Sequence, residues 1–319
     1  MIPLAEDVLA GQTRAIARAI SRVENGHPDK EALIDALYPH GGTSLILGLT
    51  GPPGSGKSSL LDLLIDKERS AGKSIAVIAV DPTSPFSGGA ILGDRLRMQK
   101  HATDDHVFIR SMASRGHLGG VAGATSDAIK VLDAAGFDII IIETIGVGQT
   151  EIDIVELSDI VMLVLVPGLG DEIQALKAGV MEIGDIFIVN KSDRDDADKV
   201  KAHIEYVLNF KYMEKPDQKN PIVMTSAVKQ DGINTLRDTI QTYYQTILNN
   251  GMLEQKRKQR IKAEIKNLIT AKIKSKVEAF LHDQGSIEAM VDGLYEKKRS
   301  PYAIINEKLN RFLQEKQSI

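Results

Sequence analysis

The sequence contains no cysteine, which excludes disulfide bonds, thiolate metal sites and cysteine nucleophiles. Tryptophan is also absent, and aromatic residues make up only 4% of the chain, too few to favour stacking platforms for single-stranded nucleic acid. No apolar run approaches the roughly 20 residues of a membrane-spanning helix. The formal net charge is only −4, so no overall attraction draws the protein to nucleic acid or to anionic membranes. We therefore expect no nucleic-acid partner and no membrane association.

The composition is that of a globular protein. With 319 residues, 43% of them hydrophobic, the chain is long enough for one large domain with helical extensions. Residues 1–7 include two acids and no basic residue, so we expect no signal or transit peptide and a cytoplasmic location.

The most informative stretch runs from Ser44 to Leu64. An apolar run at 45–49 predicts a buried strand, and the leucines at 60–64 predict a helix. Between them lie the residues that we predict to hold nucleotide phosphates: Gly51, Pro52, Pro53, Gly54, Ser55, Gly56, Lys57, Ser58 and Ser59. Glycines let backbone N–H groups converge on an anion, and the helix N-terminus adds positive charge. Lys57 is expected to reach the β- and γ-phosphates, and Ser58 to ligate Mg²⁺. The alternative is a glycine turn that only caps a helix.

Further apolar stretches predict the rest of a sheet. They lie at 74–81, 107–110, 137–143, 160–166, 186–190 and 221–226. Most do not alternate polar and apolar residues, so both faces of the sheet should be covered, and helical patterns separate them. We predict an α/β fold: a doubly wound, mostly parallel P-loop NTPase sheet with ligands at the carboxyl ends of the strands.

Helical extensions are predicted at both ends of this domain. Residues 1–42 form an N-terminal extension, with one helical segment from Leu4 to Val23 and another through Leu37. We predict a P-loop domain over residues 43–250 and a C-terminal helical dimerisation region over 251–319. There an apolar stripe from Ile261 to Leu281 accompanies a basic stretch from Lys256 to Lys266. The basic residues indicate either a nucleic-acid or membrane face, or the solvated face of a packing or dimerising helix, which we favour.

A guanine-binding motif follows the strand at 186–190. Asn190, Lys191 and Asp193 form the N-K-x-D arrangement, in which the aspartate accepts hydrogen bonds from guanine N1–H and the exocyclic amine. Adenine lacks this donor pair, so GTP is favoured over ATP. The next strand end carries Thr225 and then three residues predicted to complete the base site, the backbone N–H groups of this turn facing guanine O6: Ser226, Ala227 and Val228.

Several acids are candidates for Mg²⁺ and for catalysis. Glu143 ends a central strand, and Gly146 is expected to approach the γ-phosphate with its N–H group. Asp81 and Asp94 are further candidates, although an N-cap or turn role would also fit them. Gln149 lies three residues after Gly146, rather than directly after it as in small signalling GTPases, so the residue that positions water stays unassigned.

These residues resemble the ArgK/MeaB GTPases, accessory proteins of adenosylcobalamin-dependent acyl-CoA mutases such as methylmalonyl-CoA mutase. The resemblance covers about residues 5–250 and is looser over the C-terminal helices. The stretches that carry the resemblance are Gly48–Ser58, Val80–Pro85, Gly93–Met98, Ser114–Gly120, Glu143–Gln149 and Asn190–Asp193. The Asp-Pro-Thr-Ser-Pro and Glu-Thr-x-Gly-x-Gly-Gln sequences within them are the most specific to the family.

The resemblance implies a fold shared with signal-recognition and nickel-insertion GTPases. It also implies a homodimer through the C-terminal helices and slow GTP hydrolysis that the mutase stimulates. The implied role is a chaperone that couples GTP binding and hydrolysis to cofactor loading and protection of the mutase. In the family, Lys57, Asp81, Asp94 and Glu143 match nucleotide, magnesium and catalytic positions. The stretch 167–177 matches a third switch, where Leu169 departs from the small residue expected.

Three other functions stay open at this point. A nickel-delivery GTPase would share the core, but the chain has no cysteine and only 7 histidines. An ATP-driven kinase or transport energiser would not need the N-K-x-D motif. A nucleic-acid-associated GTPase would have to use the basic helix. The sequence does not identify which residue acts as an arginine finger; Arg95, Arg97 and Arg115 are candidates.

Overall fold

The computed structural model describes residues 2–82, 99–101, 103–114, 120–144, 150–168, 180–211, 213, 220–283, 290–291, 294–295, 297 and 300–316. The chain forms two compact units, Met1–Arg260 and Ile261–Ile319. The predicted domain boundaries, after residues 42 and 250, stay predictions.

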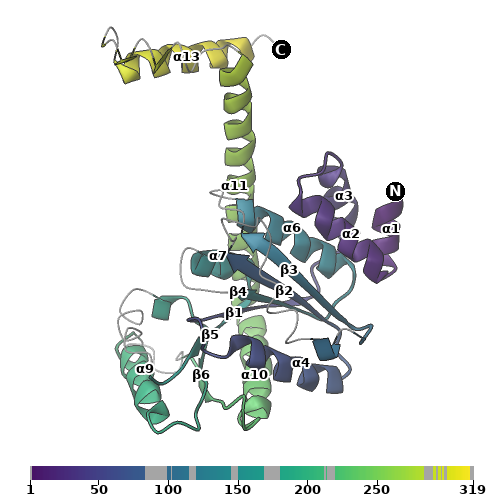
Figure 1. Cartoon of the computed structure of the whole chain (residues 1–319), viewed down its shortest axis with the longest axis vertical. Coiled ribbons are helices and arrows are strands. Elements are labelled where there is room, and N and C mark those ends of the chain that lie inside the picture. The colour runs from purple at the N-terminus through teal and green to yellow at the C-terminus, as the bar shows by residue number, and fades with distance from the viewer. Residues whose placement is uncertain are drawn as a thin grey trace. The chain divides into compact units, whose positions relative to one another are not determined.

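The first unit is built on a sheet of seven parallel strands (Figure 1). Their order is β3-β2-β4-β1-β5-β6-β7. The strands are β1 (Leu45–Thr50), β2 (Ile75–Pro82), β3 (Val107–Ser114), β4 (Ile139–Thr144), β5 (Ile160–Leu165), β6 (Ile186–Val189) and β7 (Ile222–Met224). All seven predicted strands are present, and the doubly wound α/β fold is confirmed.

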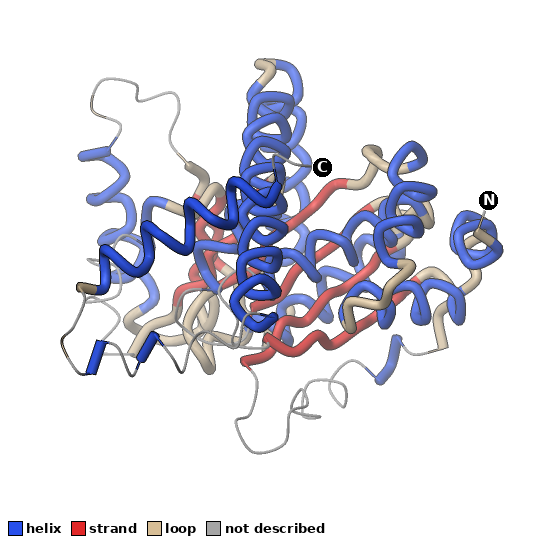
Figure 2. Tube along the Cα trace, turned by 90° about the horizontal axis from the view of Figure 1, so that it is seen from above, coloured by secondary structure: helices blue, strands red, loops and turns tan. Residues whose placement is uncertain are grey.

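Helices cover both faces of the sheet (Figure 2). Successive residues of a strand point to opposite faces, so each central strand contributes apolar side chains to both layers of helices. On one face, α4 (Lys57–Ser70) and α10 (Ile233–Asn249) pack on alternate residues of the central strands, such as Leu47 and Ile141. On the other face, α6 (Gly120–Ala134) and α7 (Thr150–Leu157) pack on residues such as Ile46 and Ile142. The helix α9 (Ala197–Lys211) lies against β5 and β6. Strands β1 and β4 are therefore apolar up to their carboxyl ends, where Thr50, Glu143 and Thr144 lie.

The N-terminal helices belong to the core of the first unit. They are α1 (Pro3–Leu9), α2 (Thr13–Glu24) and α3 (Lys30–Leu37), followed by the short turn η1 (Tyr38–His40). They share one apolar cluster with α6. The single segment predicted from Leu4 to Val23 was wrong, since the chain turns at Gly11, whose φ of 72° ends α1.

Strand β3 is longer than the predicted 107–110. It continues to Ser114 because it pairs with β2 along its full length, from Ile75 beside Val107 to Pro82 beside Ser114. Two short turns, η2 (Gln99–His101) and η3 (Val180–Glu182), lie between strands.

The helix predicted to begin near Met252 is α11 (Met252–Asp283), and α13 (Pro301–Lys316) follows it. The helix predicted at 286–298 lies largely outside the described residues. In the part of the chain that the structure describes, no helix combines the length and apolarity needed to cross a bilayer.

Candidate functional site

The candidate site lies where four strands of the sheet end. Strand β1 pairs with β4 on one side and with β5 on the other, and β6 and β7 follow beyond β5. Because all the strands are parallel, their carboxyl ends meet at one edge of the sheet, where open α/β folds bind ligands. The P-loop follows β1, the two predicted guanine-binding segments follow β6 and β7, and Glu143 is the last residue but one of β4.

Two glycines allow the P-loop to follow its path between β1 and α4. Gly51 has φ 144°, and a Cβ atom there would lie 2.3 Å from the carbonyl oxygen of Val164 on β5. Gly56 has φ 85°, and a Cβ atom there would lie 2.5 Å from the side-chain amide of Asn190. Both residues need a left-handed backbone and a close neighbour that only glycine permits. The loop is thus packed against both β5 and the N-K-x-D segment.

Lys57 is held inside the loop that precedes it. Its Nζ atom donates hydrogen bonds to the carbonyl oxygens of Gly51 at 2.6 Å and Pro52 at 2.9 Å. The side chain is buried at the N-terminus of α4, where the helix dipole adds to its positive charge. This arrangement gathers positive potential at the loop, as an anionic phosphate group requires.

Ser58 and Glu143 bring two oxygen ligands together beside the P-loop. The Ser58 hydroxyl donates to Glu143 Oε1 at 2.8 Å, and Glu143 is fully buried at the end of β4. Next to this pair, the Thr144 hydroxyl donates to the Thr50 hydroxyl at 2.9 Å, which ties the ends of β4 and β1. Hydroxyl and carboxylate oxygens are the donor set that Mg²⁺ takes in nucleotide sites. The residues present therefore fit a magnesium ion.

Asn190 joins three loops of the site. Its Nδ2 atom donates to the carbonyl oxygen of Ser55 in the P-loop at 2.8 Å. Its Oδ1 atom accepts from the hydroxyl of Thr225 and from the backbone N–H of Ala227, both at 3.3 Å. Because this side chain is buried, it braces the P-loop, the N-K-x-D segment and the segment after β7 in one arrangement.

Lys191 and Asp193 extend from the same segment. Lys191 has a left-handed φ of 58°, and its Nζ atom donates to the carbonyl oxygen of Gly54 at 2.8 Å. Asp193 Oδ1 accepts from the Ser226 hydroxyl at 2.6 Å. This hydrogen bond is the main reason why the pKa of Asp193 is lower than usual. The carboxylate is thus fixed in position and ionised, as a double hydrogen-bond acceptor must be.

The backbone N–H groups after β7 have hydrogen-bond partners within the protein. The N–H group of Thr225 donates to the carbonyl oxygen of Val189 at 2.9 Å, and that of Ser226 to the carbonyl oxygen of Asp231 at 3.1 Å. The N–H group of Ala227 makes the longest of the three bonds, to Asn190, so a base can displace it most easily. The predicted contact with guanine through this turn stays a prediction. The role of the Ser226 hydroxyl in holding Asp193 was missed, because a serine near a strand end carries no spacing signal of its own.

Other predicted residues lie at the margin of the site or outside the described residues. Ser59 lies in the first turn of α4, and Val228 is exposed after β7. Asp81 is the last residue but one of β2 and pairs with Ala113 of β3, and its side chain is outside the described part. Asp94, Gly146, Gln149, Leu169, Lys177, Arg95, Arg97 and Arg115 also lie outside the described residues.

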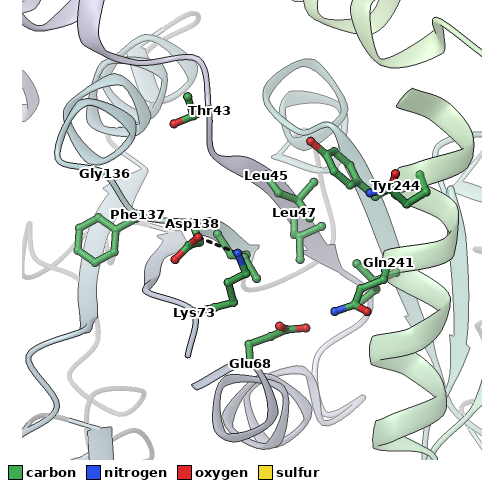
Figure 3. Close-up of a pocket in the computed structure, with 13 residues that line it drawn as sticks. Thr43, Leu45, Leu47, Glu68, Lys73, Gly136, Phe137, Asp138, Gln241 and Tyr244 are labelled. Carbon is green, nitrogen blue, oxygen red and sulfur yellow. Dashed lines mark hydrogen bonds and ion pairs between the residues drawn. The ribbon is translucent and has the colours of Figure 1, made fainter. Parts of the chain in front are cut away.

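A separate pocket of about 440 Å³ lies at the opposite end of the strands (Figure 3). Leu45 and Ile139, the first residues of β1 and β4, line it together with Tyr244 of α10. An ion pair between Lys73 and Asp138, at 2.9 Å, borders it. Because it opens at the amino ends of the strands, it is separate from the P-loop site.

The sequence matches one protein family over most of its length. The family described as methylmalonyl-CoA mutase-associated GTPase MeaB matches residues 16–281. The chain belongs to this family. It is accordingly a GTPase, and the P-loop site binds GTP and GDP.

Known proteins similar to this MeaB-family chain come from archaea, bacteria and animals. A Pyrococcus abyssi protein is 48% identical over 303 residues, covering 94% of this chain and 93% of its own. GTPase ArgK of Escherichia coli is 38% identical over 263 residues, 78% and 77% of the two chains. The mitochondrial methylmalonic aciduria type A homolog of Caenorhabditis briggsae is 35% identical over 277 residues, 81% and 67% of the two chains.

One solved structure supports the fold of the whole chain. The crystal structure of a LAO/AO transport system kinase has a TM-score of 0.71 and 25% sequence identity. The matched region covers 98% of this chain and 96% of the chain in that structure. The resemblance to the ArgK/MeaB GTPases is thus confirmed by both sequence and fold.

Proposed function

We propose that this GTPase is a chaperone for an adenosylcobalamin-dependent acyl-CoA mutase of the methylmalonyl-CoA mutase type. GTP binding and hydrolysis would be coupled to loading of the mutase with its cofactor and to its protection. The observation that carries this proposal is the family match over residues 16–281, in a family whose description names association with that mutase. The relative described as a methylmalonic aciduria type A homolog supports it. A cytoplasmic location is part of the same proposal.

The phosphate side of the site follows from the contacts around the P-loop. The backbone N–H groups of residues 51–58 and the Lys57 ammonium group would bind the phosphates and neutralise charge that develops on the β–γ bridging oxygen. Ser58 and Glu143 would hold Mg²⁺, supported by their 2.8 Å hydrogen bond. Asp81 and Asp94 would add carboxylates on the same side. When bound, the ion supplies positive charge to the phosphate oxygens.

Few protein ligands are needed for such an ion. Among the residues that the structure describes, no three His, Asp or Glu side chains gather as a closed metal site. Magnesium in nucleotide sites is commonly held by one or two protein groups, phosphate oxygens and water. We therefore propose that the ion arrives with the nucleotide and is not a permanent part of the protein.

The base side of the site supports selectivity for guanine. Asp193 would accept the two guanine donors with the carboxylate that Ser226 holds. Asn190 would hold the N-K-x-D segment in a fixed position relative to the P-loop through its hydrogen bond to the carbonyl oxygen of Ser55. Gly146 would approach the γ-phosphate, and residues 167–177 would report nucleotide state to the partner.

A homodimer is part of the proposal. In the second unit, α11 presents apolar residues at helical spacing that are about half exposed in the single chain: Ile261, Ile265, Leu268, Ile269 and Ile273. A continuous apolar stripe of this kind needs a covering surface. We propose that the equivalent helix of a second copy covers it.

The proposal is tested by complex formation with a purified acyl-CoA mutase. The protein is loaded with GDP, with GTP or with a non-hydrolysable GTP analogue and passed with the mutase over a size-exclusion column. We expect co-elution that depends on the nucleotide. The Lys57→Ala variant, which should not hold the triphosphate, serves as the control. Absence of a complex in every nucleotide state would contradict the chaperone proposal.

A second candidate is phosphate transfer to a transport protein. The solved structure with a TM-score of 0.71 is described as a LAO/AO transport system kinase. Nucleotide competition separates the two functions, because a kinase of this kind would use ATP. Hydrolysis that GTP supports and excess ATP does not inhibit would exclude it.

A further inference from the structure

The pocket at the amino ends of the strands has the dimensions of a small-molecule site (Figure 3). Its volume of about 440 Å³ lies within the range of about 300–1,000 Å³ that is usual for ligand pockets. Its floor is apolar and is formed by residues of β1, β4 and α10: Leu45, Leu47, Ile139 and Ile240. Ligand pockets commonly combine such a floor with a few polar groups that fix the orientation of the ligand.

One of the polar groups in this pocket is a buried carboxylate. Glu68 lies in the last turn of α4, and its side chain is only 6% exposed. Figure 3 shows the side chain directed from α4 into the pocket. Glutamate is rarely buried to this extent without a partner, because its charge loses the hydrogen bonds that water would donate. The groups that face Glu68 therefore decide what the pocket can bind.

The protein itself supplies Glu68 with charge but with few donors. Its Oε1 atom lies 3.2 Å from Nε of Arg237 on α10, which makes an ion pair. The buried Nε–H group of Arg237 nevertheless has no hydrogen-bond partner in the described part of the chain, so this pair is not a hydrogen bond. A carboxylate can accept about four hydrogen bonds. Glu68 is thus neutralised by Arg237, but it can still accept hydrogen bonds from a molecule in the pocket.

The other charges at the pocket are arranged to disfavour an anion. Lys73 is already paired with Asp138, at 2.9 Å. An anionic ligand would therefore meet two carboxylates, those of Glu68 and Asp138, whose cationic partners are engaged. A ligand with N–H donors meets acceptors instead. The ring of Tyr244, which lines the same pocket, adds an aromatic surface against which a flat apolar group can pack.

We propose that this pocket binds a small aromatic molecule with adjacent N–H donors, of the aromatic amidine class. Two parallel N–H groups match the two oxygens of a carboxylate, and they donate to Glu68. The aromatic ring lies on Leu47 and Ile139, beside Tyr244. This binding site goes beyond the proposed chaperone function and does not depend on it. Because the pocket opens at the opposite end of the strands from the P-loop, a nucleotide and this ligand can be bound at the same time.

Benzamidine is the probe, since it consists of a flat apolar ring and an amidinium group with two parallel donors. Its binding to the full chain is measured by ligand-observed NMR titration in the presence of saturating GDP, which occupies the P-loop site. Benzoate, which has nearly the same shape and the opposite charge, is the matched control ligand. We expect saturable binding of benzamidine in the millimolar range, as its small size allows, and no saturable binding of benzoate.

Three variants locate the bound probe. Glu68→Gln keeps the shape of the side chain and should weaken benzamidine binding at least about tenfold, because it removes hydrogen bonds to a charged group. Asp238→Asn is the matched control: it removes a carboxylate that is 71% exposed on α10, and it should change the affinity by less than about twofold. Gln241→Trp replaces an exposed residue that lines the pocket, so it should fold and block the probe. Melting temperature and GDP affinity show that each variant is folded.

Several results would overturn the inference. The parent protein might as well lack the site if it shows no saturable benzamidine binding, or if benzoate binds equally well. Binding that disappears when GDP is added would assign the probe to the P-loop site. An unchanged affinity in folded Glu68→Gln, or an equal loss in Asp238→Asn, would show that this carboxylate does not hold the probe. If Glu68→Gln does not fold, Gln241→Trp decides, and an affinity equal to that of the parent then counts against the proposal.

Discussion

Asn190→Ala should loosen the whole site, because this one side chain joins three loops. The substitution removes the donor to Ser55 at 2.8 Å and the acceptor of two longer bonds, from Thr225 and Ala227 at 3.3 Å. A buried hydrogen bond stabilises a protein by about 0.5–1.5 kcal/mol, and an abandoned buried partner costs about 1–3 kcal/mol. The carbonyl oxygen of Ser55 becomes such a partner, since Ser55 is fully buried.

The expected loss is about 2–4 kcal/mol of unfolding free energy, since the two bonds at 3.3 Å contribute little. Urea unfolding followed by circular dichroism measures it at unchanged m-value. GDP affinity should fall at least about tenfold, because the P-loop and the segment after β7 are no longer held in register. Thr225→Val is the matched control, as it keeps the shape and removes only one weak bond. A loss below about 0.5 kcal/mol for Asn190→Ala would refute the bracing argument.

Four further predictions follow from the same contacts. Lys57→Ala should abolish measurable GTP turnover, checked by phosphate release, whereas turnover at the parent rate would contradict the P-loop assignment. Asp193→Asn should weaken GTP binding and gain binding of xanthosine triphosphate, seen by nucleotide titration; an unchanged preference would show that another group reads the base. Burial alone would raise the pKa of Asp138, but hydrogen bonds from Ser74 and Lys73 lower it. The ionised carboxylate of Asp138 therefore stabilises the folded protein above about pH 3.8, and this stabilisation is lost as the pH falls through the folded-state pKa. Asp138→Asn should therefore flatten the acid limb of a urea-unfolding series. Ile269→Glu on the stripe of α11 should convert the proposed homodimer into a monomer in light scattering; a dimer that persists in this variant would contradict the role proposed for the stripe.

The fold was predictable because its signals are local. Each central strand is an unbroken apolar run, and the glycine-rich turn between a strand and a helix marks the P-loop without further context. The errors are also local in origin. The apolar stripe from Leu4 to Val23 continues across Gly11, so periodicity alone hides the turn that separates α1 from α2. The length of β3 depends on its partner β2, which its own sequence does not reveal.

The candidate site was predictable as a set of motifs but not as a network. The N-K-x-D spacing indicates Asn190 and Asp193, yet the bond from Asn190 to Ser55 joins positions 135 apart in the chain. Outside the site, the ion pairs of Asp159 with Arg257 and Arg260 of α11 have no sequence signal at all, since Asp159 lies 98 positions from Arg257 in the chain. Basic residues there indicated a solvated helix face, whereas these two arginines are partly buried against the sheet. Long-range pairing of charged groups requires the fold to be known first.

The most direct test of the chaperone function is the GTP hydrolysis rate with and without a purified adenosylcobalamin-dependent acyl-CoA mutase. The parent protein should hydrolyse GTP slowly alone and faster with the mutase, because a partner can supply groups that stabilise the charge of the transition state. The Lys57→Ala variant should stay inactive in both conditions, which excludes hydrolysis by the mutase preparation. An identical rate of the parent protein with and without the mutase would contradict the account.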